Sequence, residues 1–217
     1  MTYQADSMQP LILVGSGGHA RVLLSALRLQ GRRVLGFVDP DKARAGLVDI
    51  PYLGGDEAIS CDPEQVLLVN GLGSVAHIEN RLRVYEFFRR RGFRFLSVIH
   101  PDAIIAPEVK LGDGVQIMAG AILQTGCVVE ENCIINTGAR VDHDCVIHAH
   151  AHLAPGAVLS GNVHVGSRSH VGAGATVIQS VHIGSDTIVG AGAVVLSDVP
   201  ESCTVVGIPA RPIQVKA

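Results

Sequence analysis

Residues 141–165 read VDHDCVIHAHAHLAPGAVLSGNVHV, and every sixth residue of this stretch, beginning with the first, is a branched aliphatic. The series runs without a break from Ile105 to Val195, which makes sixteen positions. Two residues before each aliphatic stands a small or β-branched residue, such as Cys145 or Ala151. No helix has a period of six, whereas short parallel strands joined by tight turns stack with this repeat into a solenoid. We therefore expect residues 101–217 to form a parallel β-helix around an aliphatic ladder.

The small residues of the repeat indicate how narrow the interior is. Three hexads make one triangular coil, so the ladder predicts about five coils and, at about 4.8 Å per strand spacing, a prism about 25 Å tall. A large side chain at the second ladder position would push the corners of the triangle apart. Cys127, Cys133 and Cys145 stand at this position. We expect them to be buried free thiols rather than disulfides or zinc ligands.

Composition restricts the location and the partners of the chain. Its mean hydropathy is +0.35, but no apolar run reaches the roughly 20 residues of a membrane helix. The N-terminus lacks the features of a secretory signal, so we expect a cytoplasmic protein. Aromatic residues make up 4% of the chain, and residues 102–217 hold 5 Lys/Arg against 10 Asp/Glu, which argues against a nucleic-acid partner. A group of arginines is interpreted as the solvated face of a helix: Arg81, Arg83, Arg89, Arg90, Arg91 and Arg94.

Residues 1–100 have the pattern of an α/β domain. The apolar residues 11–14 predict a buried strand, followed by the turn Gly15-Ser-Gly-Gly-His-Ala20 and a helix to about Leu29. Three further strands are expected over residues 33–38, near residues 66–69 and over residues 95–99, with a helix over residues 75–91.

Four strands amount to half of a doubly wound dinucleotide domain. The glycine turn can present backbone N–H groups and a helix N-terminus to a phosphate, and Asp39 stands at the end of the second strand. We therefore expect a Rossmann-like half domain that holds one nucleotide-linked substrate. A turn needed only for tight packing of the strand against the helix is the alternative.

His143 differs from the other histidines because Asp144 follows it directly. A neighbouring carboxylate can fix the tautomer of an imidazole and stabilise the imidazolium. An imidazole held in this way can act as a general base, which takes the proton that an attacking nucleophile loses. We hypothesise that His143 is this general base and that Asp144 orients it. Covalent catalysis is disfavoured, because the ladder cysteines should point inward.

The turn of residues 15–20, the hexapeptide prism and the run NTGARVDHDC, residues 136–145, resemble one family. It is the sialic-acid O-acetyltransferase/nucleotide-aminosugar N-acetyltransferase family of hexapeptide-repeat acyltransferases, and the resemblance spans essentially the whole chain. It implies a left-handed β-helix and a homotrimer that binds acetyl-CoA between neighbouring prisms. It implies no metal. It also implies N-acetylation of the 4-amino group of a UDP- or GDP-linked 4-amino-4,6-dideoxy sugar for surface polysaccharide biosynthesis.

The resemblance also implies site residues. His143 and Asp144 receive the roles given above, and Asn136 would help to orient the sugar. His152 would contact the thioester carbonyl or the pantetheine of acetyl-CoA. The nucleotide would be contacted by Gly17, Gly18, His19, Asp39 and Gly71. The groove for pantetheine would be lined by small residues, which let it approach the backbone: Gly161, Ala173 and Ala191. The run Asp39-Pro40-Asp41 interrupts the pair of acids that is common in the family.

Three other functions remain open. Sugar O-acetylation, as on sialic acid, would use the same fold. A zinc enzyme similar to the γ-class carbonic anhydrases is suggested by the spacing of His143 and His148, and the run His148-Ala-His-Ala-His152 could place three imidazoles on one strand face. However, a tri-histidine zinc site also needs a ligand from an upstream coil, and no histidine lies between His100 and His143. The third is a non-catalytic nucleotide-sugar binder.

Overall fold

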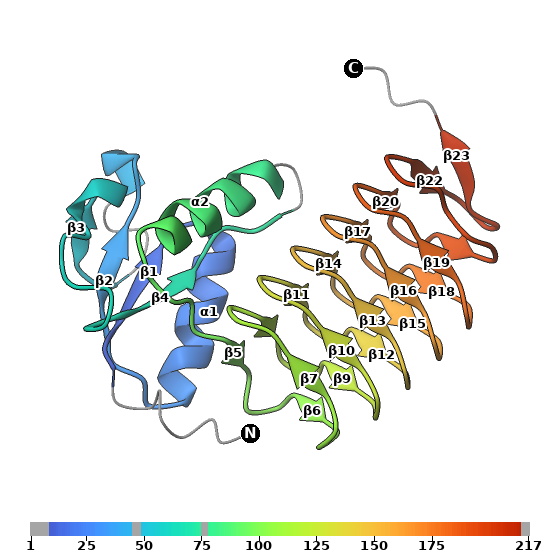
Figure 1. Cartoon of the computed structure of the whole chain (residues 1–217), viewed down its shortest axis with the longest axis horizontal. Helices are drawn as coiled ribbons and strands as arrows, with labels where there is room; N and C mark the ends of the chain where they lie inside the picture. Colours follow the sequence, from blue (N-terminus) through green and yellow to red (C-terminus); the bar gives the residue numbers. More distant parts are fainter. Residues whose placement is uncertain (1–8, 45–48, 75–77, 214–217) are drawn as a thin grey trace. The chain divides into compact units, whose positions relative to one another are not determined.

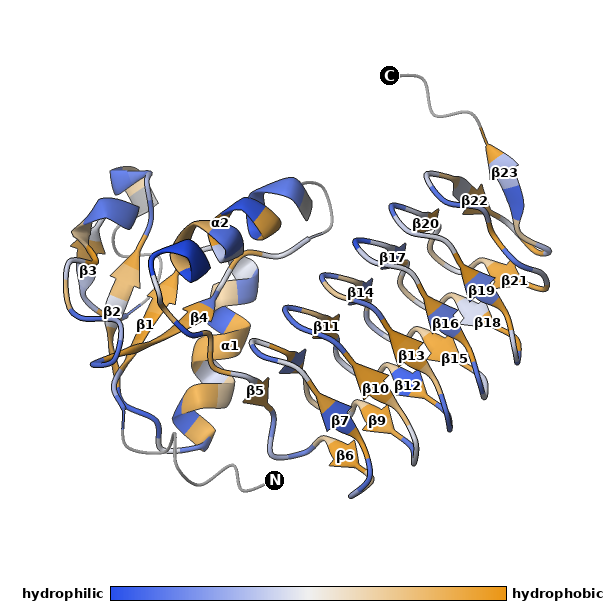
Figure 2. Ribbon diagram, in the orientation of Figure 1, coloured by the Kyte–Doolittle hydropathy of each residue, from blue (hydrophilic) through white to orange (hydrophobic). Residues whose placement is uncertain are grey.

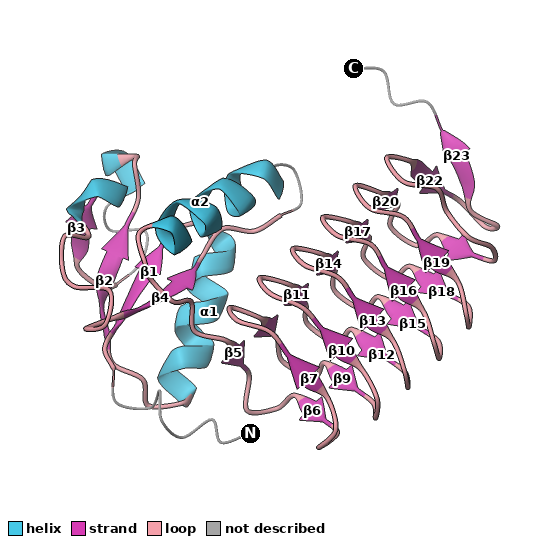
Figure 3. Ribbon diagram, in the orientation of Figure 1, coloured by secondary structure: helices cyan, strands magenta, loops and turns pink. Residues whose placement is uncertain are grey.

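The computed structural model describes residues 9–44, 49–74 and 78–213. The chain divides into two compact units, residues 1–101 and 102–217. Figure 3 shows that the described helices belong to the first unit, whereas the second consists of strands and turns. Neither helix in the described ranges is long and apolar enough to cross a membrane.

The first unit is built on a parallel sheet with the strand order β3-β2-β1-β4. Its elements, drawn in Figure 1, are β1 (Leu11–Val14), α1 (Gly18–Leu29), β2 (Val34–Val38), β3 (Tyr52–Gly54), β4 (Leu67–Asn70), α2 (Ile78–Arg90) and β5 (Val98–Ile99), with short 3₁₀ helices at Lys42–Arg44 and Asp56–Ala58. The predicted strands and helices are confirmed, with the last strand split into a bridge at Phe95 and the short β5. The first residues of the predicted second helix, 75–77, lie outside the described ranges. β3 is not among the predicted strands.

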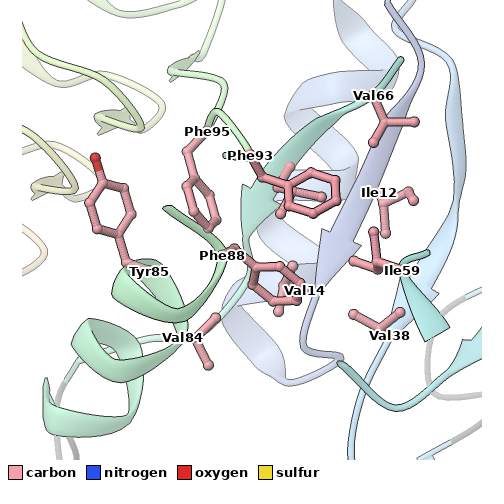
Figure 4. Close-up of a cluster of buried hydrophobic side chains, with 11 residues drawn as sticks. Ile12, Val14, Val38, Ile59, Val66, Val84, Tyr85, Phe88, Phe93 and Phe95 are labelled. Atoms are coloured by element: carbon pink, nitrogen blue, oxygen red, sulfur yellow. The ribbon is translucent and has the colours of Figure 1, made fainter. Parts of the chain in front are cut away.

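Both faces of this sheet are covered, as the continuous apolar runs of β1 and β4 require. On one face, Val84, Tyr85 and Phe88 of α2 belong to one buried cluster with Ile12 and Val14 of β1 (Figure 4). The residues of β1 and β4 that point to the other face are equally buried, and so is the apolar side of α1. The sheet therefore holds the ends of its strands rigidly, which matters because the glycine turns follow them.

The interpretation of the arginine group as a solvated face is wrong for Arg81. This residue is only 1% exposed, and its Nη1 donates to the carbonyl oxygens of Asn70 at 3.0 Å and Leu72 at 2.6 Å. A buried guanidinium is tolerated when carbonyls satisfy its donors. Arg81 therefore fixes the turn that follows β4, whereas Arg89 and Arg90 are exposed.

The second unit is a left-handed β-helix with three flat faces. Within the described residues, sixteen two-residue strands, β6 to β21, follow one another at intervals of six residues. The β6 face holds β6 (Ile104–Ile105), β9 (Ile122–Leu123), β12 (Arg140–Val141), β15 (Val158–Leu159), β18 (Thr176–Val177) and β21 (Val194–Val195). The β7 face holds β7 (Lys110–Leu111), β10 (Val128–Val129), β13 (Val146–Ile147), β16 (His164–Val165) and β19 (His182–Ile183). The β8 face holds β8 (Gln116–Ile117), β11 (Ile134–Ile135), β14 (His152–Leu153), β17 (His170–Val171), β20 (Ile188–Val189), β22 (Thr204–Val206) and the antiparallel β23 (Arg211–Ile213).

The predicted aliphatic ladder is confirmed. The second residue of every strand from β6 to β21 is a ladder residue, and from Ile117 to Val195 all of them are buried. The strands are mostly apolar in Figure 2, and polar residues concentrate in the corners between them. Cys127, Cys133 and Cys145 are fully buried free thiols that donate to backbone carbonyls.

Each coil pairs with the next at an offset of eighteen residues. Val128 pairs with Val146, and Val146 pairs with His164. The corners follow the same register, because the N–H of Asp144 donates to the carbonyl of Thr125, and that of Asn162 to the carbonyl of His143. A residue at a corner therefore lies between the residues eighteen positions before it and after it.

Shortening a ladder side chain should destabilise the β-helix. Leu123, on β9, is 1% exposed, and the next residue, Gln124, is exposed. Leu123→Ala should lower the free energy of unfolding by about 2–5 kcal/mol through lost burial and a cavity, whereas Gln124→Ala should change it by about 0.5 kcal/mol or less. Urea denaturation at one protein concentration measures both. Equal losses would contradict the inward direction of the ladder.

Candidate active site

His143 and Asp144 form a hydrogen-bonded couple on the surface of the β-helix. They lie in the corner between β12 and β13, which joins the β6 face to the β7 face, and the Nδ1 of His143 is 2.9 Å from the Oδ2 of Asp144. Their side chains are 55% and 65% exposed. Because the carboxylate accepts a hydrogen bond from Nδ1, the second ring nitrogen, Nε2, is left as the basic atom.

The backbone of this corner fixes the couple. Asp144 has a φ of 58°, the left-handed conformation that occurs at every sixth residue of the solenoid and that aspartate tolerates better than most residues. The N–H of His143 donates to the Oδ1 of Asp142 at 2.8 Å. Asp142 was not anticipated from the sequence as a partner of His143.

Asp144 also changes the acidity of His143. The hydrogen bond that Nδ1 donates to Asp144 is the largest influence and raises the pKa of the imidazole above its ordinary value. Desolvation opposes the rise, and the charges of Asp142 and Asp144 add to it. A raised pKa means a stronger base. At a pH above the pKa of His143 the imidazole is neutral, and the couple can then take a proton from an ammonium or amine group.

The β8 face carries a second polar pair, Asn136 and His152. The Nδ2 of Asn136 lies 3.1 Å from the Nε2 of His152, and the Oδ1 of Asn136 accepts from the N–H of Thr137. Since that oxygen is already bonded to an N–H donor, the amide presents its NH₂ group to His152. His152 is 2% exposed, and its ring meets that of His170 edge to face. The structure brings Asn136 to His152 but places it on a different corner from His143.

The three small residues assigned to the pantetheine groove do not form one row. Gly161 lies on the corner of His143, one coil later, and it is buried. Ala173 and Ala191 are exposed and stack one coil apart on another corner, which joins the β8 face to the β6 face. This follows from the spacing, because residues 161 and 173 differ by twelve and only an interval of eighteen returns to the same corner.

The residues assigned to the nucleotide gather at the carboxyl ends of β1, β2 and β4. Gly17, Gly18 and His19 begin α1, Asp39 follows β2, and Gly71 follows β4. A Cβ atom at Gly71 would lie 2.7 Å from the carbonyl oxygen of Val14, so only glycine fits there. Parallel sheets bind ligands at this edge, where the strand order reverses.

Asp39 is buried and held by donors of its own unit. Its Oδ2 accepts from the N–H of Ser16 at 3.1 Å and from the Ser16 hydroxyl at 2.6 Å, and its Oδ1 accepts from the N–H of Asp41. Ser16 was not among the predicted site residues, although it lies inside the glycine turn. The carboxylate therefore ties the turn after β1 to the end of β2.

The run His148-Ala-His-Ala-His152 does not lie on one strand face. His148 follows β13, His150 lies in the turn and His152 is in β14, so they turn around a corner. His148 pairs with Glu130 at 3.1 Å, and the Nδ1 of His150 is 3.0 Å from the Nδ2 of Asn132. In the part of the chain that the structure describes, no group of three or more His, Cys, Asp or Glu side chains is placed to hold a metal ion.

A pocket of about 460 Å³ opens on the β7 face and is lined by His148, His164, His182 and Asp198 among others. None of the residues assigned to the active site lines it. It is therefore separate from the couple of His143 and Asp144.

Comparisons with known proteins agree with this arrangement. A profile described as "Bacterial transferase hexapeptide (six repeats)" matches residues 108–143, 126–161 and 144–179, and a profile described as "PglD N-terminal domain" matches residues 10–86. A variant of perosamine N-acetyltransferase from Caulobacter crescentus, solved with CoA and GDP-perosamine, is 39% identical; the match covers 96% of this chain and 98% of that one, with a TM-score of 0.88. The chain belongs to this family of hexapeptide-repeat acyltransferases.

Two other members of the family extend the comparison. The acetyltransferase domain of PglB from Neisseria gonorrhoeae FA1090, solved with acetyl coenzyme A, is 36% identical over 94% of this chain and 99% of that one, with a TM-score of 0.88. WeeI from Acinetobacter baumannii AYE is 27% identical over 95% of this chain and 100% of that one, with a TM-score of 0.84. A search of curated proteins gives no significant match. Membership of the family makes this chain an acyltransferase.

The pKa of His143 should depend on its neighbour. In the free protein we expect the imidazole to titrate above about 6.5, and Asp144→Asn should move the pKa down towards that value, since it removes the acceptor charge at Nδ1. NMR titration of the histidine resonances measures this. Asp186→Asn, which removes a carboxylate paired with Arg168 instead, is the control and should leave the pKa of His143 unchanged. An unchanged titration in Asp144→Asn would refute the coupling.

Proposed function

We propose that the protein is an acetyl-CoA-dependent N-acetyltransferase that acts on the 4-amino group of a nucleotide-linked 4-amino-4,6-dideoxy sugar. The observation that carries this proposal is the 2.9 Å bond between His143 and Asp144, which gives an exposed corner of the β-helix a strengthened base. Membership of the acyltransferase family and the glycine turn of the first unit support it.

The reaction is a direct transfer. The lone pair of the sugar amine attacks the thioester carbonyl carbon of acetyl-CoA, and the Nε2 of His143 accepts the proton that the nitrogen loses. The carbon–sulfur bond then breaks, and the proton passes to the departing thiolate, so the products are an amide and free CoA. Asp144 stabilises the imidazolium between these two steps. The ladder cysteines take no part, because their thiols are buried in the prism.

The acceptor binds through its nucleotide in this proposal. Gly17, Gly18 and His19 offer the N-terminus of α1 to the diphosphate, with Asp39 and Gly71 beside them at the same sheet edge. α1 has no acidic residue in its first turn, so no negative side chain of its own opposes a phosphate there. Because the Caulobacter crescentus relative was solved with GDP-perosamine, a GDP-linked sugar is the first candidate and a UDP-linked sugar the second.

The donor site would need more than one copy of the chain. A thioester attacked beside His143 and bound by His152 must lie within a few ångströms of both, but His143 lies on the corner between the β6 and β7 faces of one prism, whereas His152 is on the β8 face. Six residues of extended chain, about 20 Å, make one side of the triangle. A homotrimer would place the corner of His143 in one copy against the β8 face of another, with Ala173 and Ala191 along the pantetheine.

The proposed substrates and the thiols favour one compartment. The five cysteines of the chain are free, which suits the reducing conditions of the cytoplasm. We therefore place the enzyme in the cytoplasm, where it would supply an acetylated sugar for the synthesis of a surface polysaccharide.

The activity is tested by mass spectrometry of products from a panel of GDP- and UDP-linked 4-amino sugars with acetyl-CoA. We expect an added acetyl group on nitrogen, and His143→Ala should lower kcat by about 10²–10⁴-fold, because the base is lost. His164→Ala, on the β7 face, is the matched control and should retain activity. Acetylation of a hydroxyl, or near-normal turnover of His143→Ala, would refute the proposal.

The pH dependence of kcat follows from the raised pKa of His143. Only the neutral imidazole accepts a proton, so activity should be lost as the pH falls through this pKa and should reach a plateau above it. Asp144→Asn should lower the plateau and shift the acidic limb to lower pH, since the imidazolium loses its partner. Rates measured between pH 5 and 9 at saturating substrates would show it. An acidic limb at the same pH in both proteins would contradict the assignment.

A further inference from the structure

Gly161 lies under the ring of His143. It stands one coil after His143 at the same corner position, and a Cβ atom built on it would lie 2.5 Å from both the Cε1 and the Nε2 of the imidazole. Carbon atoms do not approach an aromatic ring so closely, because their van der Waals contact distance is about 3.5–4.0 Å. The ring of His143 can therefore keep its place only if residue 161 has no side chain.

Gly126 leaves space for the carboxylate of Asp144 in the same way. It stands one coil before Asp144, and a Cβ atom on Gly126 would lie 2.3 Å from the Oδ1 of Asp144. The imidazole thus leans over the coil that follows, and the carboxylate leans over the coil that precedes. These two glycines, in the coils before and after that of the couple, leave the space that both side chains occupy.

Backbone conformation does not require glycine at position 161. Its φ lies outside the left-handed range, and the equivalent turn positions carry side chains in Thr125, Thr137, Ala149 and Pro155. Gly126 differs in this respect, since its φ is +77°, but the sixth-residue position it occupies also accepts Asp144 and Asn162. The space taken by the couple is therefore the specific reason for glycine at 161.

We propose that Gly161 and Gly126 are positioning residues, which hold the imidazole of His143 and the carboxylate of Asp144 in contact by leaving room for them in the neighbouring coils. This proposal rests on the role of His143 in the proposed function. It assigns to Gly161 a task in addition to its expected place along the pantetheine groove. The tilt of the base would thus be set by the coils on either side of it.

The consequences of adding a methyl group differ between the two sites. In Gly161→Ala the ring must swing off its present position, which takes Nδ1 away from Asp144 and Nε2 away from the acceptor. In Gly126→Ala the carboxylate must move, while the ring keeps its own space. Both changes should lower the pKa of His143 towards its ordinary value, because that pKa is raised chiefly by the hydrogen bond that Nδ1 donates to Asp144.

The experiment compares Gly161→Ala and Gly126→Ala with Gly138→Ala. Gly138 is a matched control, since it has a φ of +66° in an equivalent turn, and a Cβ atom there would meet no described residue beyond its chain neighbours within 4 Å. NMR titration of the free protein measures the pKa of His143, and steady-state assays separate kcat from KM. We expect a downward shift of the pKa in the first two variants and a fall of kcat by about 10²-fold, as for a misplaced catalytic group. Gly138→Ala should show neither.

A double-mutant comparison separates positioning from general damage. If Gly126 acts through the carboxylate, Gly126→Ala should have little further effect on the pKa of His143 in the Asp144→Asn protein. Because alanine occupies an equivalent turn position at Ala149, Gly161→Ala should fold and so decides the question if Gly126→Ala does not. An unchanged pKa of His143 in Gly161→Ala, or equal effects of Gly126→Ala and Gly138→Ala, would overturn the proposal. The titration needs no substrate, so it gives this answer even if no acetyl transfer is detected.

Discussion

The register of the β-helix governs the rest of the second unit. Its interior has room for one aliphatic and one small residue per hexad, so each coil closes after eighteen residues and pairs with the next at that offset. The side-chain contacts at the corners repeat the offset: Asn132 with His150, Asn162 with Ser180, and Arg168 with Asp186. The couple of His143 and Asp144 is confined in the same way, between Gly126 and Gly161. Packing inside the prism thus fixes which surface groups meet.

Much of the fold could be predicted because it follows from a short period. The sixth-residue ladder predicts every strand from β6 to β21 and its inward residue, and the run of Ile12 and its neighbours before the glycine turn predicts β1, an inner strand of the first unit. The bond between His143 and Asp144 was also expected, since adjacent residues in a tight turn can reach each other. The roles of the site residues in binding and transfer stay predictions, tested by the experiments above.

Other features depend on contacts that no local pattern carries. β3 is three residues long and follows a proline, so it has too little periodicity to be recognised. Arg81 resembles its exposed neighbours in sequence, and only the carbonyls at the end of β4 explain its burial. Predicting that Gly161 and Ala173 lie on different corners requires the eighteen-residue length of a coil rather than the six-residue repeat of the strands. The same interval would have revealed Gly161 as the residue beneath His143.

The six-residue repeat and the eighteen-residue coil respond differently to insertions and deletions in the chain. Inserting one hexad after Gly161 would keep every aliphatic side chain inside the prism, so the solenoid would continue with one more strand. The same insertion would rotate all later corners by a third of a turn and move Ala173 and Ala191 away from their present edge. Only the gain or loss of a whole coil would restore them. The interior therefore tolerates steps of six residues, whereas the surface chemistry is compatible only with steps of eighteen.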